Sequence, residues 1–125
     1  MTREEAEAFA LRWAGWWNAG AVESVLEAFH DDVVFVSPTA LAVVGSATVR
    51  GKPALRAYWT AAMQRVKTVQ FTVGHIVWDP ALRELAIVYT SSIAGATKRV
   101  SENLRFDESG KIVAAEVFHG VAGSA

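Results

Sequence analysis

The sequence predicts an α+β domain in which helices close a curved, cone-shaped antiparallel sheet. Apolar residues recur at helical spacing near the start of the chain and again after residue 51. The second half alternates between apolar and polar residues, the period of half-buried strands, and short turn sequences separate the runs. Helices followed by closely connected strands are the layout of the α+β class. Because strands twist, such a sheet curves, and helices over its concave face can enclose a pocket.

The composition describes one folded domain over residues 1–125. Hydrophobic residues make up 52% and charged residues 20% of the chain, a balance typical of globular proteins. A net charge of -1 without a basic cluster argues against a nucleic-acid partner. The charged N-terminus lacks the apolar core of a signal peptide, and no apolar run is long enough to cross a membrane. We therefore expect a cytoplasmic protein with no membrane partner.

The first helix begins at a capping box, in which Thr2 and Glu5 satisfy free N–H groups of the first turn. Aromatic residues between Phe9 and Trp17 follow at helical spacing, and the helix ends before Gly20, a residue type that favours helix termini. A second, short helix over residues 22–29 has its apolar residues on one side.

The middle of the chain is less regular. Residues 30–32 predict a polar turn, and residues 33–37 predict a strand that Pro38 ends, because proline cannot donate to a ladder. Residues 39–50 leave two interpretations open, a short hairpin or an ordered loop. A third helix over residues 51–66 has proline near its first turn and an apolar stripe along its length.

Two strands over residues 68–78 and 84–93 follow, with an Asp-Pro turn between them. His75 has the same parity as Phe71 and Val73 on the first of these strands. Parity does not decide its face, because both faces of the sheet would be buried if a second subunit covered the convex side.

The last strands form a hairpin over residues 100–120, with Asp-Glu-Ser-Gly as its turn. A turn of two or four residues would place Glu102 opposite Val117 or Ala115. Both registers put Glu102 on the same apolar face as His119. Since this face holds one carboxyl and one imidazole among apolar side chains, it is the predicted location of the site.

Four local sequences resemble the nuclear transport factor 2-like superfamily, which includes ketosteroid isomerases and the SnoaL-type polyketide cyclases. They are Trp-Asn-Ala-Gly at residues 17–20, and the segments over residues 29–38, 51–59 and 104–113. Together they span most of the chain. The resemblance implies a cystatin-like cone with an internal pocket, and it is weak for function because the superfamily includes many chemistries and also non-enzymes.

Comparison with the ketosteroid isomerases implies a changed active site. Their oxyanion-binding Tyr and Asp correspond to Trp13 and Glu102, their proton-transfer Asp corresponds to Ser37, and a supporting Tyr corresponds to Trp59. Of these four positions, only Glu102 has a side chain of the same chemical type, a carboxylic acid, as in the ketosteroid isomerases. Since Ser37 cannot act as a carboxylate base at neutral pH, the resemblance implies a similar cavity without typical ketosteroid isomerase activity.

Glu102 and His119 are the candidate catalytic residues. Burial disfavours an ionised carboxyl, so Glu102 is expected to have a raised pKa and to act as an acid or hydrogen-bond donor. Imidazole suits proton transfer near neutral pH, and His119 is the expected base. Structural roles are the alternatives: Glu102 could be solvated or paired with Lys98, and His119 could bond to a backbone carbonyl in the core.

Aromatic side chains and one hydroxyl are expected to contact a substrate. These candidates are Trp13, Trp17, Phe35, Ser37, Trp59 and Tyr89. A wall of aromatic rings favours a small, flat, apolar molecule. We expect neither a cofactor nor a metal, because the sequence has no phosphate-binding loop or dinucleotide fingerprint, no cysteine, and only three scattered histidines.

The sequence thus favours cofactor-independent acid–base chemistry of isomerase, cyclase, dehydratase or hydratase type on a small apolar molecule. The alternative is a non-catalytic ligand-binding or dimeric interaction module of the same fold. Val34, Val36 and Phe118 have outward parity on their strands. We therefore expect a homodimer through the convex face of the sheet.

Overall fold

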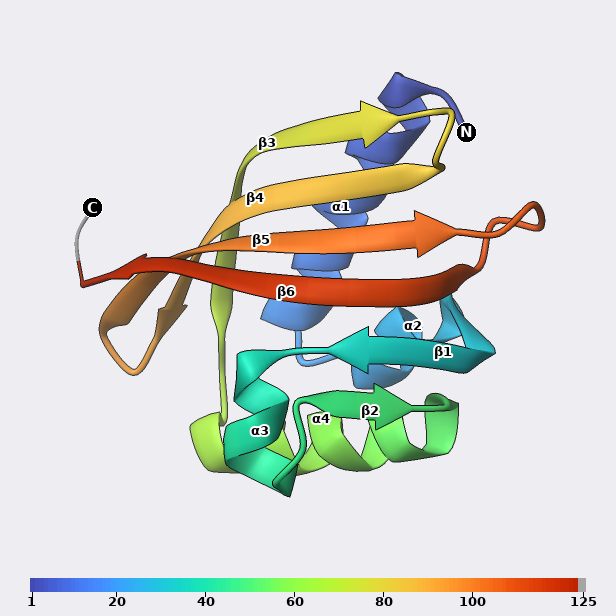
Figure 1. Ribbon diagram of the computed structural model, residues 1–125. Helices are drawn as coiled ribbons and strands as arrows, with labels where there is room; N and C mark the ends of the chain where they lie inside the picture. Colours follow the sequence, from blue (N-terminus) through green and yellow to red (C-terminus); the bar gives the residue numbers. More distant parts are fainter. Residues whose placement is uncertain (124–125) are drawn as a thin grey trace.

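The computed structural model describes residues 1–123 and shows helices lying against one side of a single sheet (Figure 1). The helices are α1 (Arg3–Asn18), α2 (Val22–Glu27), α3 (Pro38–Val44) and α4 (Lys52–Val66). The strands are β1 (Phe29–Val36), β2 (Thr48–Arg50), β3 (Gln70–Asp79), β4 (Glu84–Ile93), β5 (Ala96–Phe106) and β6 (Ile112–Ala122). The predicted α+β class is confirmed.

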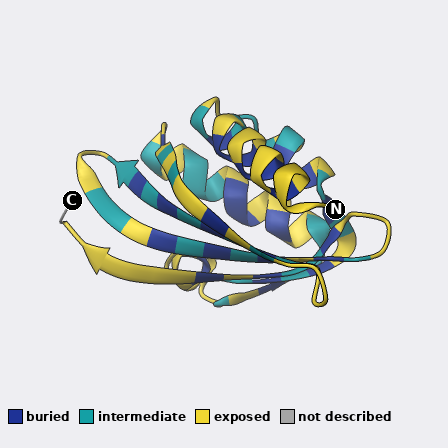
Figure 2. Ribbon diagram, turned by 90° about the horizontal axis from the view of Figure 1, so that it is seen from above, coloured by how far each residue is buried: buried dark blue, intermediate teal, exposed yellow. Residues whose placement is uncertain are grey.

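The strands form one sheet in the order β2-β1-β6-β5-β4-β3. Neighbouring strands are antiparallel, as predicted, except for β1 and β6, which run parallel. Most of the chain separates β1 from β6, so no tight turn forces them to be antiparallel. Seen from above, the sheet is curved and unclosed, and the long helices α1 and α4 lie on its concave side (Figure 2).

Helices α1 and α4 cover different flanks of the concave face, since α1 packs on β3 and α4 packs on β1. The capping box predicted for α1 is present: the Thr2 N–H donates to Glu5 Oε1 at 2.7 Å, and the Glu5 N–H donates to Thr2 Oγ1 at 3.1 Å. Phe9, Trp13 and Trp17 form the buried face of this helix. No helix within residues 1–123 is long and apolar enough to cross a membrane.

Two predictions for the middle of the chain are wrong. Residues 30–32, expected as a polar turn, belong to β1, because Phe29 pairs with Ile112 of β6 and keeps the following residues extended. Residues 39–50, expected as a hairpin or loop, lie in α3 and β2 and the short segment between them. Their apolar runs are too short for periodicity to separate a helix from a strand.

The start and end of α3 follow from three residues. Ser37 is its N-cap, and the Ser37 Oγ accepts a hydrogen bond from the Thr39 N–H at 3.2 Å. Pro38, expected only to end the preceding strand, also occupies the first turn of the helix, where its missing N–H costs nothing. Gly45 ends the helix in the left-handed conformation, with φ of 81°.

A β-bulge decides on which face His75 lies. The register of β3 against β4 shifts between Val73 and His75, and His75 pairs with Val88. Gly74 occupies the bulge, where an added Cβ would lie 3.3 Å from the Val88 carbonyl oxygen. His75 is therefore exposed on the convex face, although its parity in the sequence matches that of Phe71.

Asn18, the last residue of α1, ties this helix to the free edge of β3. Its Nδ2 donates to the Phe71 carbonyl oxygen at 3.0 Å, and its Oδ1 accepts from the Phe71 N–H at 2.7 Å. The side-chain amide thus satisfies both backbone groups that a neighbouring strand would otherwise bond. This contact positions β3 beside the helix that supplies Trp13 and Trp17.

We expect Asn18→Ala to lower the free energy of unfolding by about 2–3 kcal/mol, because two hydrogen bonds are lost and the Phe71 backbone groups lose their partner. Urea denaturation followed by circular dichroism measures this change. Glu7→Ala is the matched control on the same helix, since it removes only an exposed i,i+4 ion pair with Arg3. It should change stability by less than about 0.5 kcal/mol. An Asn18→Ala protein as stable as this control would contradict the role assigned to Asn18.

Candidate functional site

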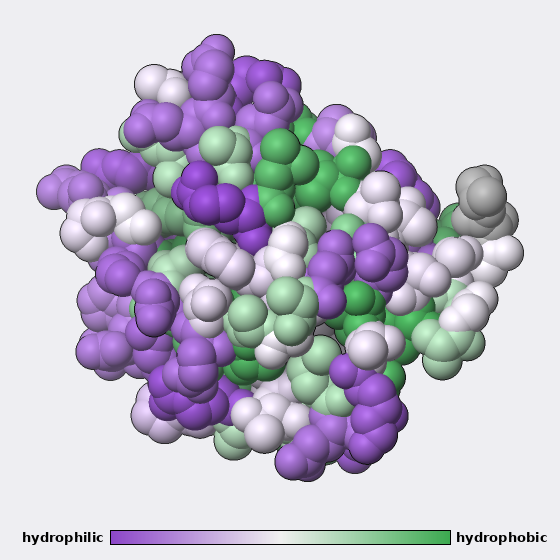
Figure 3. Space-filling model, turned by 180° about the vertical axis from the view of Figure 1, so that it is seen from behind, coloured by the Kyte–Doolittle hydropathy of each residue, from purple (hydrophilic) through white to green (hydrophobic). Residues whose placement is uncertain are grey.

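A cavity of about 450 Å³ lies between the concave face of the sheet and helices α1 and α4. Volumes of this size are typical of small-molecule sites. The exposed lining residues Ala96, Ala122 and Gly123 place its mouth where the β4–β5 turn meets the end of β6. Seen from the helical side, hydrophobic residues interrupt a largely hydrophilic surface (Figure 3).

One side of the cavity is built from aromatic rings on four elements. Trp17 of α1 meets Trp59 of α4 edge to face, with ring centroids 5.0 Å apart. Trp13 stacks on Phe71 of β3 at 5.5 Å, and Phe35 of β1 meets Trp59 edge to face at 5.5 Å. These contacts leave little freedom for the rings, so the apolar wall is rigid and suited to a flat ligand.

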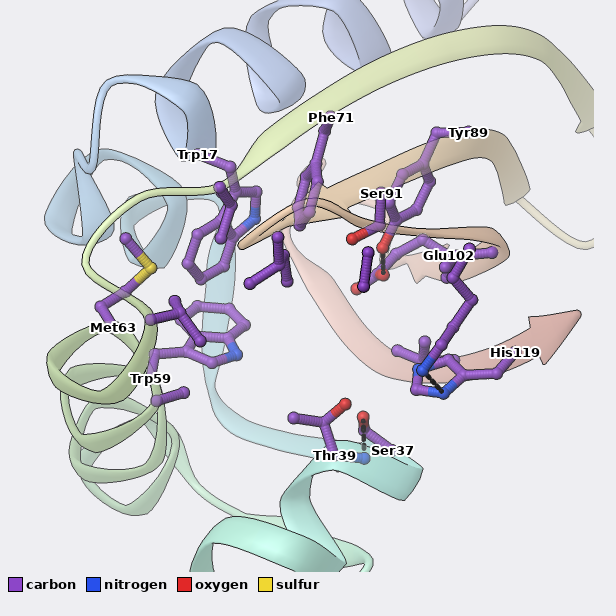
Figure 4. A pocket seen from close by; sticks show the side chains of 18 of the residues that line it. Trp17, Ser37, Thr39, Trp59, Met63, Phe71, Tyr89, Ser91, Glu102 and His119 are labelled. Atoms are coloured by element: carbon purple, nitrogen blue, oxygen red, sulfur yellow. Dashed lines mark hydrogen bonds between the residues drawn. The ribbon is translucent and has the colours of Figure 1, made fainter. Parts of the chain in front are cut away.

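The opposite side carries the polar groups, which come from the sheet (Figure 4). Glu102 of β5 pairs with Val117 of β6, which is one of the two predicted registers, and Val100 pairs with His119. Glu102 is 5% exposed, and its Oε1 accepts a hydrogen bond from the Tyr89 Oη of β4 at 3.2 Å. The carboxyl is therefore buried in the cavity wall with Tyr89 as its hydrogen-bond partner, whereas Lys98 contacts His119.

Burial raises the pKa of Glu102 from 4.5 to about 7, and the hydrogen bond from Tyr89 opposes this rise. Burial and the nearby Glu102 carboxyl raise the pKa of Tyr89 well above its ordinary value of 10.0. Tyr89 thus stays protonated and can donate, whereas Glu102 can both accept and release a proton near neutral pH.

His119 and Lys98 form a second polar group nearer the mouth. Lys98 Nζ lies 3.3 Å from His119 Nδ1. Burial and the lysine charge lower the pKa of His119, which favours a neutral imidazole. An ammonium group has only donors, so Nδ1 accepts from it and the proton of the neutral ring is on Nε2. His119 therefore presents an N–H donor, not a free base nitrogen.

All eight residues predicted for the site line the cavity: Glu102, His119, Trp13, Trp17, Phe35, Ser37, Trp59 and Tyr89. Sequence reasoning missed five polar lining residues, which are Thr39, Tyr58, Ser91, Thr97 and Lys98. Ser91 shares the inward parity of Tyr89 on β4, a signal that could have found it. Tyr58 lies within the apolar stripe that the sequence predicts for residues 51–66, and Thr39 lies in the segment whose structure was predicted wrongly.

Tyr58 extends the polar surface from the sheet to α4. Burial raises its pKa, the hydroxyls of Ser37 and Thr39 oppose the rise, and Glu102 adds a smaller upward effect. The Tyr58 phenol thus lies near two hydroxyls, and the charge of the Glu102 carboxyl affects its pKa. Within residues 1–123, no group of three or more His, Asp or Glu side chains is placed to hold a metal ion.

Comparison with known proteins agrees with this geometry. The SnoaL-like domain family matches residues 10–115. A SnoaL-like protein of unknown function from Burkholderia thailandensis superposes with a TM-score of 0.86 at 24% identity, over 96% of this chain and 98% of that chain. No curated protein sequence matches the chain.

Two further solved structures superpose over nearly their whole length. SalBIII, described as an epoxide hydrolase/cyclase-like enzyme with a role in pyran ring formation in salinomycin, has a TM-score of 0.75 at 16% identity, over 98% of this chain and 97% of that chain. TerC, co-crystallized with polyporic acid, has a TM-score of 0.75 at 14% identity, over 92% of each chain. At these identities the superpositions show the fold, and they confirm the predicted NTF2-like architecture.

The raised pKa of Glu102 makes stability depend on pH. Between 4.5 and about 7 the folded protein holds a proton at Glu102 that the unfolded chain has lost. The contribution of Glu102 to the free energy of unfolding therefore falls as pH rises through this range, by about 3 kcal/mol in total. Urea denaturation of the wild type and of Glu102→Gln at a series of pH values measures this contribution of Glu102 to the free energy of unfolding. A stability difference that does not change with pH would show that the carboxyl is not perturbed.

Proposed function

This chain belongs to the SnoaL-like domain family, and from that premise we propose that it is a cofactor-independent acid–base enzyme acting on a small apolar molecule. The observation that supports this most strongly is a carboxyl with a pKa of about 7 in the wall of an apolar cavity. A group with this pKa is present in both protonation states at neutral pH and can transfer protons in either direction.

Glu102 would remove or deliver the proton, and the Tyr89 hydroxyl would hold the carboxyl in place through its 3.2 Å hydrogen bond. His119, expected to be the base from the sequence alone, is better suited to donate from Nε2, because Nδ1 faces Lys98. Ser37 and Tyr58 would position an oxygen of the substrate. The reaction class is proton transfer on carbon or oxygen, as in isomerisation, cyclisation, dehydration or hydration.

The structural neighbours support a small-molecule function for the pocket. SalBIII is described as cyclase-like and linked to ring formation, and TerC was crystallized with polyporic acid, a small molecule. Both have the fold of this chain over almost all of its length. The rival interpretation is a module that binds a ligand in the same pocket without turning it over.

Proton exchange tests the catalytic proposal without knowledge of the natural substrate. We expect the wild type to accelerate exchange of the acidic C–H of 2-tetralone in D2O, measured by NMR, with a rate that rises with pH through about 7. Glu102→Gln should slow exchange by about 10²–10⁴-fold, because it removes the base. Glu116→Gln, on the exposed side of β6, is the matched control and should exchange at the wild-type rate.

Trp59→Ala separates binding from catalysis in the same assay, because it removes an aromatic wall without touching the carboxyl. It should weaken binding of 2-tetralone, measured by tryptophan fluorescence, more than it slows exchange at saturation. A wild type that binds the ketone without exchange, or a Glu102→Gln protein that exchanges normally, would favour the non-catalytic module.

The proposal includes a homodimer formed through the convex face. A groove on this face is lined in part by Val34, Val36, Ala114 and Phe118, and Phe118 is 51% exposed. Apolar side chains gathered on one sheet face favour association with another protein surface. A second copy is the simplest occupant, since it would bury the same residues on both subunits.

Light scattering at micromolar concentration should therefore give the mass of a dimer, and Phe118→Glu should give a monomer, because it buries a charge in the interface. Leu11→Glu is the matched control: Leu11 is 60% exposed on α1, away from this face. It should remain dimeric. A monomeric wild type would contradict this part of the proposal.

A further inference from the structure

Two polar pairs in the cavity, Glu102 with Tyr89 and Lys98 with His119, have different surroundings, and the proposed reaction gives no role to Lys98. Glu102 and Tyr89 are buried, whereas Lys98 and His119 lie partly exposed toward the mouth. Figure 4 shows His119 and its hydrogen bond facing the cavity from the sheet side, across from Trp17 and Trp59. We propose that Lys98 and His119 form a carboxylate-binding subsite, and that the ligand of this pocket is a flat apolar acid.

The first support is the charge of Lys98. Lys98 is the single lysine or arginine in the cavity lining formed by residues 1–123. Within the same residues it makes no ion pair with a carboxylate, whereas five other basic residues do. Its contact is a neutral imidazole, which leaves the positive charge uncompensated. A cation in this situation is available to an anionic ligand.

The second support is the orientation of the donors. Lys98 donates one hydrogen to His119 Nδ1 and has two further N–H groups. His119 then has its proton on Nε2. That N–H points away from Lys98, so the carboxylate would be bound by the two remaining N–H groups of Lys98, and His119 Nδ1 would hold the ammonium in place. Charge-assisted hydrogen bonds of this kind are stronger than neutral ones.

The third support is the spacing along the sheet. His119 pairs with Val100, and Glu102 pairs with Val117, so His119 and Glu102 are diagonal neighbours on the inner face. Diagonal residues are about 7–8 Å apart. The bound carboxylate and the atom that exchanges a proton with Glu102 would therefore be different parts of the ligand, contacting neighbouring positions of the inner face. The rest of the ligand would lie against the aromatic wall.

This inference rests on the proposed function, since it assigns a second contact to the ligand of the same pocket. Its test uses two probes of equal shape, 2-naphthoate and its neutral analogue 2-naphthamide. Binding is measured by quenching of tryptophan fluorescence at about pH 6, where Glu102 is largely uncharged and the naphthoate is ionised. The wild type should bind the acid about tenfold more tightly than the amide, and added salt should reduce this preference.

Lys98→Met should abolish the preference for the acid while changing the affinity for the amide less than about twofold, and Lys98→Arg should restore most of it. Arg99→Met is the matched control, because it removes the same charge from the next residue of β5, on the exposed face. It should keep the preference.

Equal affinities of the wild type for both probes would overturn the carboxylate subsite while leaving the apolar pocket intact. A preference that survives Lys98→Met would also overturn it. Failure of both probes to bind the wild type would instead count against the apolar binding pocket, and the subsite would fall with it. Loss of proton exchange in Glu102→Gln is independent of these results, so the two proposals can fail separately.

Discussion

The site depends on the contact between Trp17 and Trp59. Helices α1 and α4 cover opposite flanks of the concave face, and these two indoles join them edge to face at 5.0 Å. Because the helices pack on β3 and β1, the inner face of β4, β5 and β6 is left partly uncovered between them. The cavity is thus a consequence of how the sheet is covered. The aromatic side of the cavity is part of the packing between helices and sheet. The polar residues on its other side can be replaced without disturbing that packing.

Burial of the Glu102 carboxyl lowers the stability of the folded protein, and the hydrogen bond from Tyr89 offsets only part of this loss. Glu102 is 5% exposed and accepts one hydrogen bond, from Tyr89. In the protonated state little free energy is lost, because a neutral acid is cheaper to bury than an ion. Ionisation near neutral pH is the expensive state, and it is also the state a general base requires. Stability and reactivity therefore oppose each other at this residue, as is common at functional sites.

Periodicity in the sequence predicted the strands and the face on which Glu102 and His119 meet, since alternation along a hairpin fixes which side chains share a face. It could not predict the bulge at Gly74, which turns His75 outward, because bulges depend on contacts between strands. It also gave the wrong structure for residues 39–50, where α3 is too short to show a helical period. The contact between Lys98 and His119 was missed because both lie near strand ends, where side-chain partners depend on three-dimensional curvature.

Strand β5 shows how chemistry can change while the fold is kept. Its inward side chains run from Lys98 at the mouth, through Val100 and Glu102, to Leu104 and Phe106 at the closed end. Phe106 packs on Phe9 of α1 at 5.4 Å, so the closed end is part of the core and cannot vary without loss of stability. The mouth end contacts the cavity, where substitutions change the ligand and not the packing. A fold divided in this way can support different reactions on one sheet, which is why the identity of a few residues near the mouth, and not the architecture, decides what this protein binds.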